Sequence, residues 1–269
     1  MKVGYLGPEG TFSEAASIDY FTAPGTVRIP FMTFWEILEA VRGGEVDQGI
    51  LPIENSIEGS VTSVLDGLQH YTDLYINGEM ILNVEQNLMV LEGTELEDLT
   101  EIWSHPQPIA QCRQYLQKLN VETKTFGSTA QAAAALKNAQ NSRVGVLGPA
   151  WTAEKFGLKM IARNIQDVEE NHTRFIAIGR GLHVPANASN SFILVAPHLE
   201  RPGVLVNILN VFASLNLNLT WIESRPTKKR LGDYQFFLKI AEGLEHESMK
   251  KAISILELYG HSVQLLGSF

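Results

Sequence analysis

The stretch "KVGYLGPEGTFSEAASIDYF", Lys2 to Phe21, decides the fold class. Its first five residues are typical of a short buried strand, and a glycine-rich turn follows. The segment from Thr11 onward is predicted to be a helix entered through that turn. A strand that passes through such a turn into a helix is the first half of a βαβ unit.

The same alternation continues along the chain. Residues 33–44 predict a second helix, with Thr33 and Glu36 spaced as a capping box and Gly43 as the stop. An apolar strand at 48–55 and a helix at 60–71 follow. This rhythm predicts a mainly parallel sheet with helices on both faces.

Residues 101–148 repeat the pattern and predict a second α/β lobe. Before it, the β-rich segment 74–91 contains Asn77-Gly78, which is typical of a tight turn. After it, "NHTRFIAIG" at 171–179 predicts a strand that returns to the first lobe. We therefore expect lobe one at about 1–76 plus 166–181 and lobe two at about 77–165, with a ligand site between them.

The last eighty residues have a different character. A linker rich in small and turn residues, 181–190, leads into segments that predict the order βαββαβ over 190–269. This order is the ferredoxin-like split pattern, which is small enough to form its own domain. Such domains commonly serve regulation or dimer formation.

Composition narrows the classes of partner. Of 269 residues, 45% are hydrophobic and 19% charged, as in ordinary globular proteins. Residues 1–189 carry 13 Lys+Arg against 23 Asp+Glu, a net charge of −10, and residues 190–269 carry 8 against 7, a net charge of +1. An acidic body disfavours nucleic acid or an anionic membrane as partner.

The sequence predicts a cytoplasmic protein without metal or cofactor. The N-terminus lacks the extended apolar core of a secretory signal, and no run of 18 apolar residues occurs. Cys112 is the single cysteine, which excludes an intrachain disulfide and argues against a cysteine-based metal site. Neither HExxH nor CxxC is present.

Polar clusters lie where strands end or helices begin, which is where open α/β sheets bind ligands. They are "GPEGTFSEAA" (7–16), "PIENSIEGSV" (52–61), "SHPQPIAQC" (104–112) with "GSTAQAA" (127–133), and "NHTRF" (171–175). In this order the clusters resemble the signature blocks of the prephenate dehydratase family over essentially the whole chain. The tail, with "ESRP" at 223–226, resembles the ACT regulatory domain of that family.

The resemblance implies the fold and the reaction. The fold would be a two-lobed, periplasmic-binding-protein-like α/β catalytic domain at 1–181 and an α+β ferredoxin-like ACT domain at 190–269. The reaction would be the decarboxylating dehydration of prephenate to phenylpyruvate in phenylalanine biosynthesis. The N-terminus opens directly on the first strand, so a monofunctional chain is expected. Arogenate dehydratase and a non-catalytic small-anion sensor are the alternatives.

The essential threonine of the family maps to Thr173. A hydroxyl is a poor acid near neutral pH, so we expect Thr173 to act as an oriented donor to the leaving hydroxyl. Glu54 is the candidate conventional acid, because burial beside the ligand would raise its pKa. The alternative for Glu54 is a solvated strand-end carboxylate or a helix cap.

Further residues are candidates for substrate binding. Arg174 remains open between a substrate clamp and a hinge ion pair, because in a regular strand Thr173 and Phe175 share one face and Arg174 points to the other. His105 and His172 are expected to cap or pack, and Cys112 to be buried. The substrate-binding candidates are Ser13, Asn55, Ser56, Ser104, Gln111, Thr129, Arg174 and Phe175.

The resemblance also implies an effector site for L-phenylalanine in a homodimer or homotetramer. Gly203 would let the backbone approach closely, and first-turn N–H groups of the following helix would hold a carboxylate. A valine stands at 204 where many family members have alanine. The implied residues are Gly203, Val204, Leu205 and Val206 of one subunit with Glu223, Ser224 and Arg225 of a neighbour.

Overall fold

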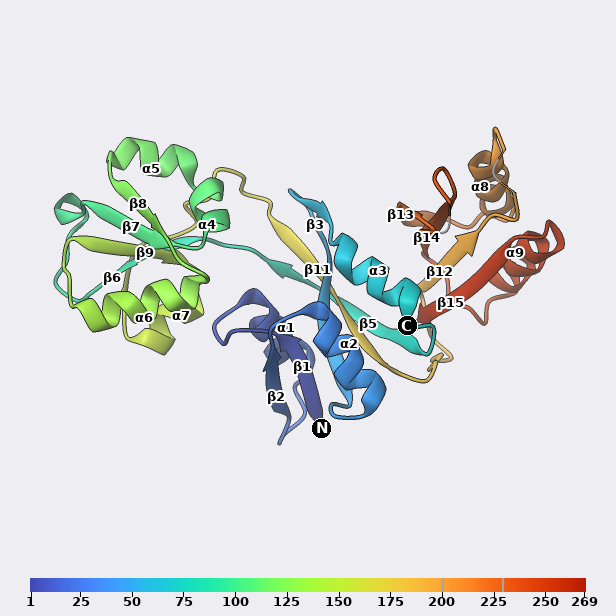
Figure 1. Cartoon of the computed structure of the whole chain (residues 1–269), viewed down its shortest axis with the longest axis horizontal. Coiled ribbons are helices and arrows are strands. Elements are labelled where there is room, and N and C mark those ends of the chain that lie inside the picture. The colour runs from blue at the N-terminus through green and yellow to red at the C-terminus, as the bar shows by residue number, and fades with distance from the viewer. Residues whose placement is uncertain (200, 229) are drawn as a thin grey trace.

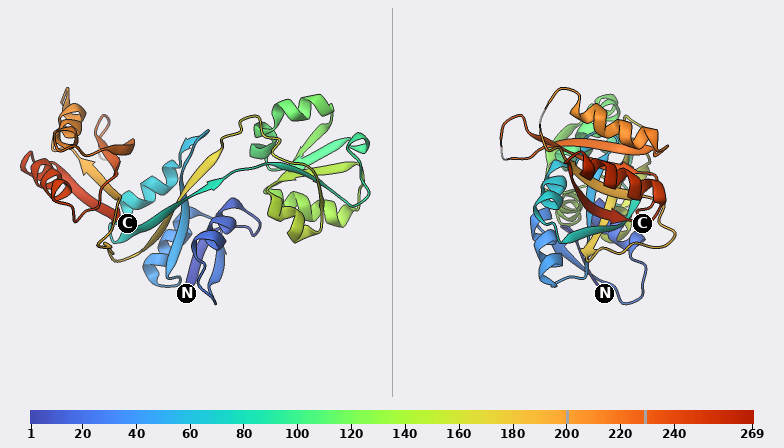
Figure 2. Two further views of the ribbon diagram at one scale, coloured as in Figure 1. Left: turned by 180° about the vertical axis from the view of Figure 1, so that it is seen from behind. Right: turned by 90° about the vertical axis from the view of Figure 1, so that its right-hand side faces the viewer.

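The computed structural model describes residues 1–199, 201–228 and 230–269. Three α/β bodies follow one another along the long axis of the molecule (Figure 1). Lobe one lies in the middle, lobe two on one side of it, and the C-terminal body on the other. The view from behind shows the same order (Figure 2).

Lobe one is built on a mixed sheet. Strand β1 (Lys2–Leu6) pairs in parallel with β2 (Val27–Phe31) and with β3 (Gln48–Asn55), whereas β11 (His172–Arg180) pairs antiparallel with β3 and with β5 (Leu74–Asn83). The two-residue strand β4 (Gly59–Ser60) folds back on β3. The prediction of a mainly parallel sheet is therefore wrong, because the two strands that connect the lobes both pair antiparallel.

Local signals explain the helices of lobe one: α1 (Phe12–Tyr20), α2 (Phe34–Gly43) and α3 (Thr62–His70). The capping box of Thr33 and Glu36 is confirmed, and the left-handed Gly44 ends α2. Thr11 caps α1 by accepting from the backbone N–H of Glu14.

Strand β5 corrects the expected Asn77-Gly78 turn. The strand runs unbroken from Leu74 to Asn83, and its pairing with β11 shifts register between Ala177 and Ile178. A Cβ at Gly78 would overlap the hydroxyl of Tyr20, so glycine permits a close approach rather than a turn. Strand β5 therefore belongs to the sheet of lobe one along its whole length.

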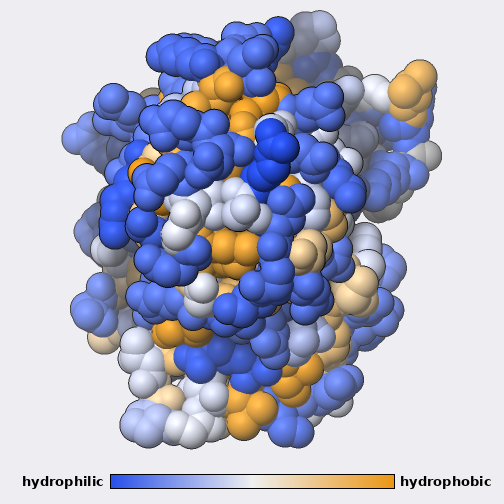
Figure 3. All heavy atoms as spheres, turned by 90° about the vertical axis from the view of Figure 1, so that its left-hand side faces the viewer, coloured by the Kyte–Doolittle hydropathy of each residue, from blue (hydrophilic) through white to orange (hydrophobic). Residues whose placement is uncertain are grey.

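Lobe two carries the second sheet, in the order β10-β6-β9-β7-β8. Viewed from this end, the surface is mainly hydrophilic with small hydrophobic patches (Figure 3). The chain enters through 84–86 and returns through 163–171. Its elements are β6 (Asn87–Val90), η1 (Leu96–Asp98), β7 (Glu101–Ser104), α4 (Pro106–Gln111), α5 (Arg113–Leu119), β8 (Glu122–Thr125), α6 (Thr129–Ala139), β9 (Val144–Gly148), α7 (Ala150–Phe156) and β10 (Lys159–Ala162).

The predicted βαββαβ order of the tail is confirmed. The four strands form an antiparallel arrangement in the order β13-β14-β12-β15. Helices α8 and α9 cover one face through a core that includes Ile193, Phe212 and Leu238. The elements are β12 (Ser191–Ala196), α8 (Val204–Ser214), β13 (Leu219–Pro226), β14 (Tyr234–Ile240), α9 (Glu247–Leu258) and β15 (Ser262–Ser268).

The tail is joined to lobe one, which sequence reasoning does not anticipate. Gly267 of β15 pairs in parallel with Ile76 of β5, so the two sheets form one ten-stranded sheet. A Cβ at Gly267 would overlap the Ile76 carbonyl, and glycine is therefore needed there. The tail face away from its helices contributes Phe192 and Phe237 to the core of lobe one.

Candidate functional site

A cleft of about 590 Å³ lies between the two lobes. Lobe one lines it with residues after β1 and β3, lobe two lines it with the segments before α4 and α6, and β11 contributes Thr173 and Phe175. Three side chains of lobe two donate hydrogen bonds to lobe one: Gln107 Nε2 to Glu58 Oε1 (2.7 Å), Trp151 Nε1 to the Gly10 carbonyl (3.2 Å) and Lys155 Nζ to Glu9 Oε2 (2.8 Å). The cleft thus has walls from both lobes, and polar contacts join its two sides.

Four helices begin at this cleft. Its lining includes the first residues of α1 and α3 from lobe one and of α4 and α6 from lobe two. The start of α4 differs from the other three, because Pro106 and Pro108 have no N–H and the Gln107 N–H is bonded to His105 Nδ1. Unpaired N–H groups and the positive end of the helix dipole make such positions favourable for anions. Among the described residues that line the cleft, none is lysine or arginine. The arrangement therefore favours a small anion through backbone donors rather than through charged side chains.

Thr173 is held by Asn55. The Asn55 Nδ2 donates to Thr173 Oγ1 (2.9 Å) and to Asn171 Oδ1 (2.8 Å). The Asn55 Oδ1 accepts the backbone N–H groups of Ile57 and Glu58, both at 3.0 Å. Because only an oxygen can accept those two donors, the orientation of the amide is fixed.

No described residue of the chain accepts the hydroxyl hydrogen of Thr173, which is therefore available to a ligand. Thr173 Oγ1 accepts from Asn55, so its own O–H must point to a different acceptor. Thr173 is 9% exposed and lines the cleft. The pair presents one oriented hydrogen-bond donor to whatever occupies the cleft.

Arg174 lies on the opposite face of β11. Its Nε donates to Glu54 (3.2 Å) and its Nη1 donates to Glu79 (2.9 Å). Neither Arg174 nor Glu54 is among the described residues lining the cleft. Glu54 and Thr173 thus lie on opposite faces of the sheet, and Arg174 is engaged by two carboxylates outside the cleft.

The other predicted residues divide into two groups. Ser13, Asn55, Gln111, Thr129, Thr173 and Phe175 line the cleft. Ser56 and Ser104 do not. Ser56 Oγ accepts the His172 N–H (2.9 Å) and fastens the start of β11, whereas the fully buried Ser104 donates to the Leu147 carbonyl (2.8 Å).

Sequence reasoning missed several residues that line the cleft, among them Gln86, Glu58, Gln107 and Ser128. Gln86 Nε2 donates to Gln111 Oε1 (3.1 Å), which leaves Gln86 Oε1 and Gln111 Nε2 without a hydrogen-bond partner in the described part of the chain. A buried polar atom without a partner is costly, so a ligand or water is expected there. Gln86 lies in the segment 84–86, through which the chain enters lobe two. Within the β-rich sequence 74–91, no motif distinguishes this glutamine as a binding residue.

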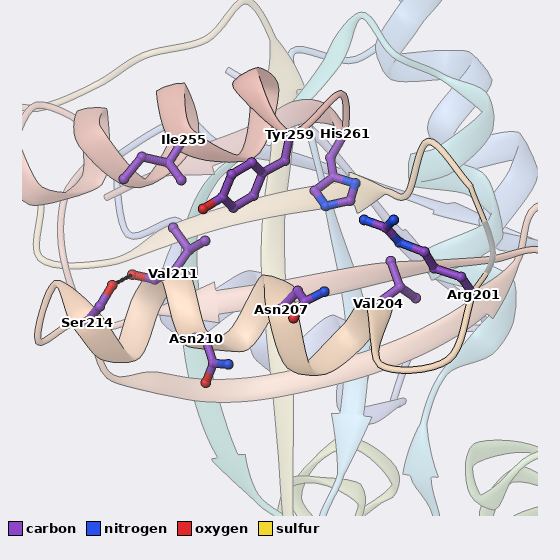
Figure 4. A pocket seen from close by; sticks show the side chains of 9 residues that line it. All are labelled: Arg201, Val204, Asn207, Asn210, Val211, Ser214, Ile255, Tyr259 and His261. Atoms are coloured by element: carbon purple, nitrogen blue, oxygen red, sulfur yellow. Dashed lines mark hydrogen bonds between the residues drawn. The ribbon is translucent and has the colours of Figure 1, made fainter.

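The tail has a separate cavity of about 570 Å³ between α8 and α9. Side chains from both helices point into it, with Arg201 and His261 at one end (Figure 4). Of the predicted effector residues, Val204 lines this cavity, and Gly203 begins α8 with a left-handed backbone (φ 84°). Glu223 and Arg225 instead contact lobe one through Ser60 (2.6 Å) and Asp66 (3.0 Å).

Two features are absent from residues 1–199, 201–228 and 230–269 of the chain. These residues contain no helix that combines the length and apolar character needed to cross a membrane. They also contain no group of three or more His, Cys, Asp or Glu side chains arranged to hold a metal ion.

The fold and cleft define a two-lobed α/β protein with an interlobe cleft of mixed polar and apolar lining and a C-terminal βαββαβ body. A family model described as "Prephenate dehydratase" matches residues 3–182. A prephenate dehydratase of Methanocaldococcus jannaschii is 35% identical over 98% of this chain and 96% of that protein. The chain therefore belongs to the prephenate dehydratase family, whose members are decarboxylating lyases.

Solved structures agree over the whole chain. The prephenate dehydratase of Staphylococcus aureus subsp. aureus Mu50 is 32% identical, with a TM-score of 0.92 and full coverage of both chains. The prephenate dehydratase of Arthrobacter aurescens in complex with L-Phe is 33% identical, with a TM-score of 0.89, and covers 100% of this chain and 89% of that one. The similarity thus includes the C-terminal body as well as the two lobes.

Proposed function

We propose that this chain converts prephenate to phenylpyruvate with loss of CO₂ and water, in a periplasmic-binding-protein-like catalytic domain at 1–181. The observation that carries the proposal is the Asn55–Thr173 pair, which leaves one hydroxyl donor directed away from Asn55 in a cleft lined by helix N-termini. Family membership supplies the substrate class, and the geometry supports the way it is bound and activated.

Binding follows from the two carboxylates of prephenate. One carboxylate would lie at the N-termini of α1 and α3, and the other at that of α6. Gln111 Nε2 supplies a further donor without a partner among the described residues. An acidic protein binds a dianion here because oriented dipoles at close range outweigh a distant background charge that salt screens.

The chemistry needs a donor at the departing hydroxyl. The C–C bond to the ring carboxylate breaks, its electron pair enters the ring, and the ring C–O bond breaks so that the ring becomes aromatic. The departing oxygen gains negative charge, which Thr173 Oγ1–H stabilises by a hydrogen bond, and it leaves as water after protonation. Phe175, 2% exposed, forms an apolar wall beside it.

We further propose that the tail, 190–269, is an ACT domain that binds L-phenylalanine and lowers turnover in a cytoplasmic homodimer or homotetramer. Support comes from the βαββαβ order, from the left-handed Gly203 at the start of α8, and from the similar structure that holds L-Phe. Val206 is 57% exposed and Ser224 is exposed, so both are available to a second subunit.

The test is direct. The purified protein is given prephenate and, separately, arogenate; phenylpyruvate or phenylalanine formation is followed with and without millimolar L-phenylalanine. Prephenate turnover that L-phenylalanine reduces is expected. Turnover of arogenate alone would change the substrate, and binding of prephenate without turnover would make the protein a sensor. Glu54→Gln is expected to keep more activity than Thr173→Ala.

A further inference from the structure

The sheet of the tail packs against helices α8 and α9 on one face and against lobe one on the other. Residues on β14 alternate, so Phe236 and Leu238 pack under α8 and α9, whereas Phe237 packs on lobe one. Lys239 shares the face of Phe237. This lysine is therefore aimed at the catalytic domain from within the regulatory body.

Lys239 is buried and paired. It is 5% exposed, and its ammonium donates to Glu79 Oε1 on β5 in a short contact. The other oxygen of Glu79 accepts from Arg174 Nη1 (2.9 Å), and Arg174 Nε donates to Glu54 (3.2 Å). Four charges of alternating sign thus run from the tail across β5 and β11 to β3, and each buried charge has an opposite partner.

The chain of charges ends at an irregularity of the strand pair that holds Thr173. Thr173 lies opposite Asn55 and Arg174 opposite Glu54, but Phe175 lies opposite Pro52, so β3 has one extra residue here. A bulge disrupts the backbone ladder and changes the direction of neighbouring side chains. The Arg174–Glu54 ion pair therefore lies beside the point where the backbone pairing of β11 with β3 is interrupted, so side-chain contacts help to fix the register of these two strands.

A second contact reaches the same point. Glu223 of β13 accepts a hydrogen bond from Ser60 Oγ (2.6 Å), and Ser60 is paired with Glu54 between β4 and β3. Both Lys239 and Glu223 belong to the regulatory body. The segment that carries Glu54 and Asn55 is thus tied to that body on two sides.

From these contacts we infer that Lys239 and Glu79 are positioning residues: the Lys239–Glu79–Arg174 chain sets the orientation of the Thr173 hydroxyl and couples the regulatory body to the cleft. This inference rests on the proposed function. A movement of β14 relative to β5 changes how Glu79 divides its two oxygens between Lys239 and Arg174. Arg174 then pulls on β11 between Thr173 and Phe175, both of which line the cleft.

The test compares Lys239→Met, Lys239→Arg and Lys228→Met with the wild type. Lys228 pairs with Asp66 across the same interface (2.8 Å) but has no contact with Glu79 or Arg174 among those described, so it is the matched control. For Lys239→Met we expect kcat to fall about tenfold or more, since small displacements at a reacting centre cost that much, with KM nearly unchanged. L-phenylalanine should still bind, as measured by calorimetry, but should no longer change kcat.

Lys239→Arg should restore both kcat and the response, and Lys228→Met should resemble the wild type. The inference would be overturned if Lys239→Met kept the wild-type kcat and the wild-type inhibition by L-phenylalanine. It would also be overturned if Lys228→Met lost as much of both as Lys239→Met does. If Lys239→Met fails to fold by circular dichroism, Glu79→Gln replaces it, with the same expectations and the same contrary outcomes. Absence of prephenate turnover by the wild type would instead refute the proposed function, and the inference with it.

Discussion

Asn55 donates a hydrogen bond from Nδ2 to Thr173 Oγ1 at 2.9 Å, and two backbone N–H groups fix the amide in that orientation. The Thr173 hydroxyl, which we propose as the donor to the leaving group, cannot donate to Asn55, because the Asn55 amide nitrogen is itself a donor. The orientation of one amide thus determines the role of the threonine, and the following prediction depends on it.

Asn55→Asp reverses this hydrogen bond. The Asp Oδ1 still accepts from Ile57 and Glu58, but the second oxygen accepts from Thr173 and withdraws its proton from the cleft. We expect kcat to fall by about 10² to 10³-fold, the usual cost of losing one such donor, and KM to rise as well, because the new carboxylate lies in the wall of a cleft that binds a dianion. Steady-state kinetics measures both. An Asn55→Asp enzyme with nearly normal kcat would contradict the assigned donor direction.

The variant Ser104→Ala distinguishes a role of Ser104 in the stability of the fold from a role in substrate binding. Ser104 is fully buried and donates to the Leu147 carbonyl, which the substitution leaves without that partner. The free energy of unfolding should fall by about 1–3 kcal/mol in urea titrations, while kcat and KM stay within about twofold. Ser189→Ala, at an exposed serine, is the control and should change stability by less than about 0.5 kcal/mol. A selective rise in KM would show that Ser104 binds substrate after all.

Cys112 should be inert in the folded protein. Burial, followed by the nearby Asp167 carboxylate, raises the pKa of the Cys112 thiol to about 12, so almost no thiolate exists at pH 8. A thiol reagent such as DTNB should label it only at the rate of unfolding, and completely in urea. Stoichiometric labelling within minutes under native conditions is the result that this account does not allow.

His261 should make the folded state less stable in acid. Burial, followed by the charges of Arg201 and His198, lowers the pKa of His261 from its usual 6.5. Between the two pKa values the unfolded chain binds more protons than the folded one, so the free energy of unfolding falls as pH drops below about 6.5.

Unfolding free energies at pH 7.5 and 5.5 measure this effect. His261→Gln should lose less stability between these pH values than the wild type does. His183→Gln, at an exposed histidine, should keep the wild-type difference. Identical losses in the wild type and His261→Gln would assign the acid sensitivity to other groups.

Much of the fold could be predicted from short sequence patterns. The Thr33–Glu36 capping box, the glycine-rich turn before α1 and the βαββαβ order of the tail are each encoded within a few residues, and each is present. Period-two alternation also predicted that Arg174 would face away from Thr173 and Phe175. Asn77-Gly78 misled because a glycine needed for a close approach to Tyr20 has the same sequence signature as a turn.

Contacts between residues distant in sequence could not be predicted. The buried Ser104 donates a hydrogen bond to a carbonyl 43 residues away, and Glu54 pairs outside the cleft with Arg174, 120 residues later. The pairing of Lys239 with Glu79 spans 160 residues and depends on the docking of the tail through Gly267 and Ile76. Such partners are determined by the docking of whole elements, for which a single sequence carries no local pattern.

The proposed donor role of the Thr173 hydroxyl is tested by the kcat values of Thr173→Val and Thr173→Ser with prephenate as substrate. Valine keeps the shape of threonine and removes the donor, whereas serine keeps the donor. If Thr173 is the donor, the kcat of Thr173→Val should fall about 10² to 10³-fold with little change in KM. Thr173→Ser should retain most of the wild-type activity. Turnover by Thr173→Val at a rate close to the wild type would contradict that role.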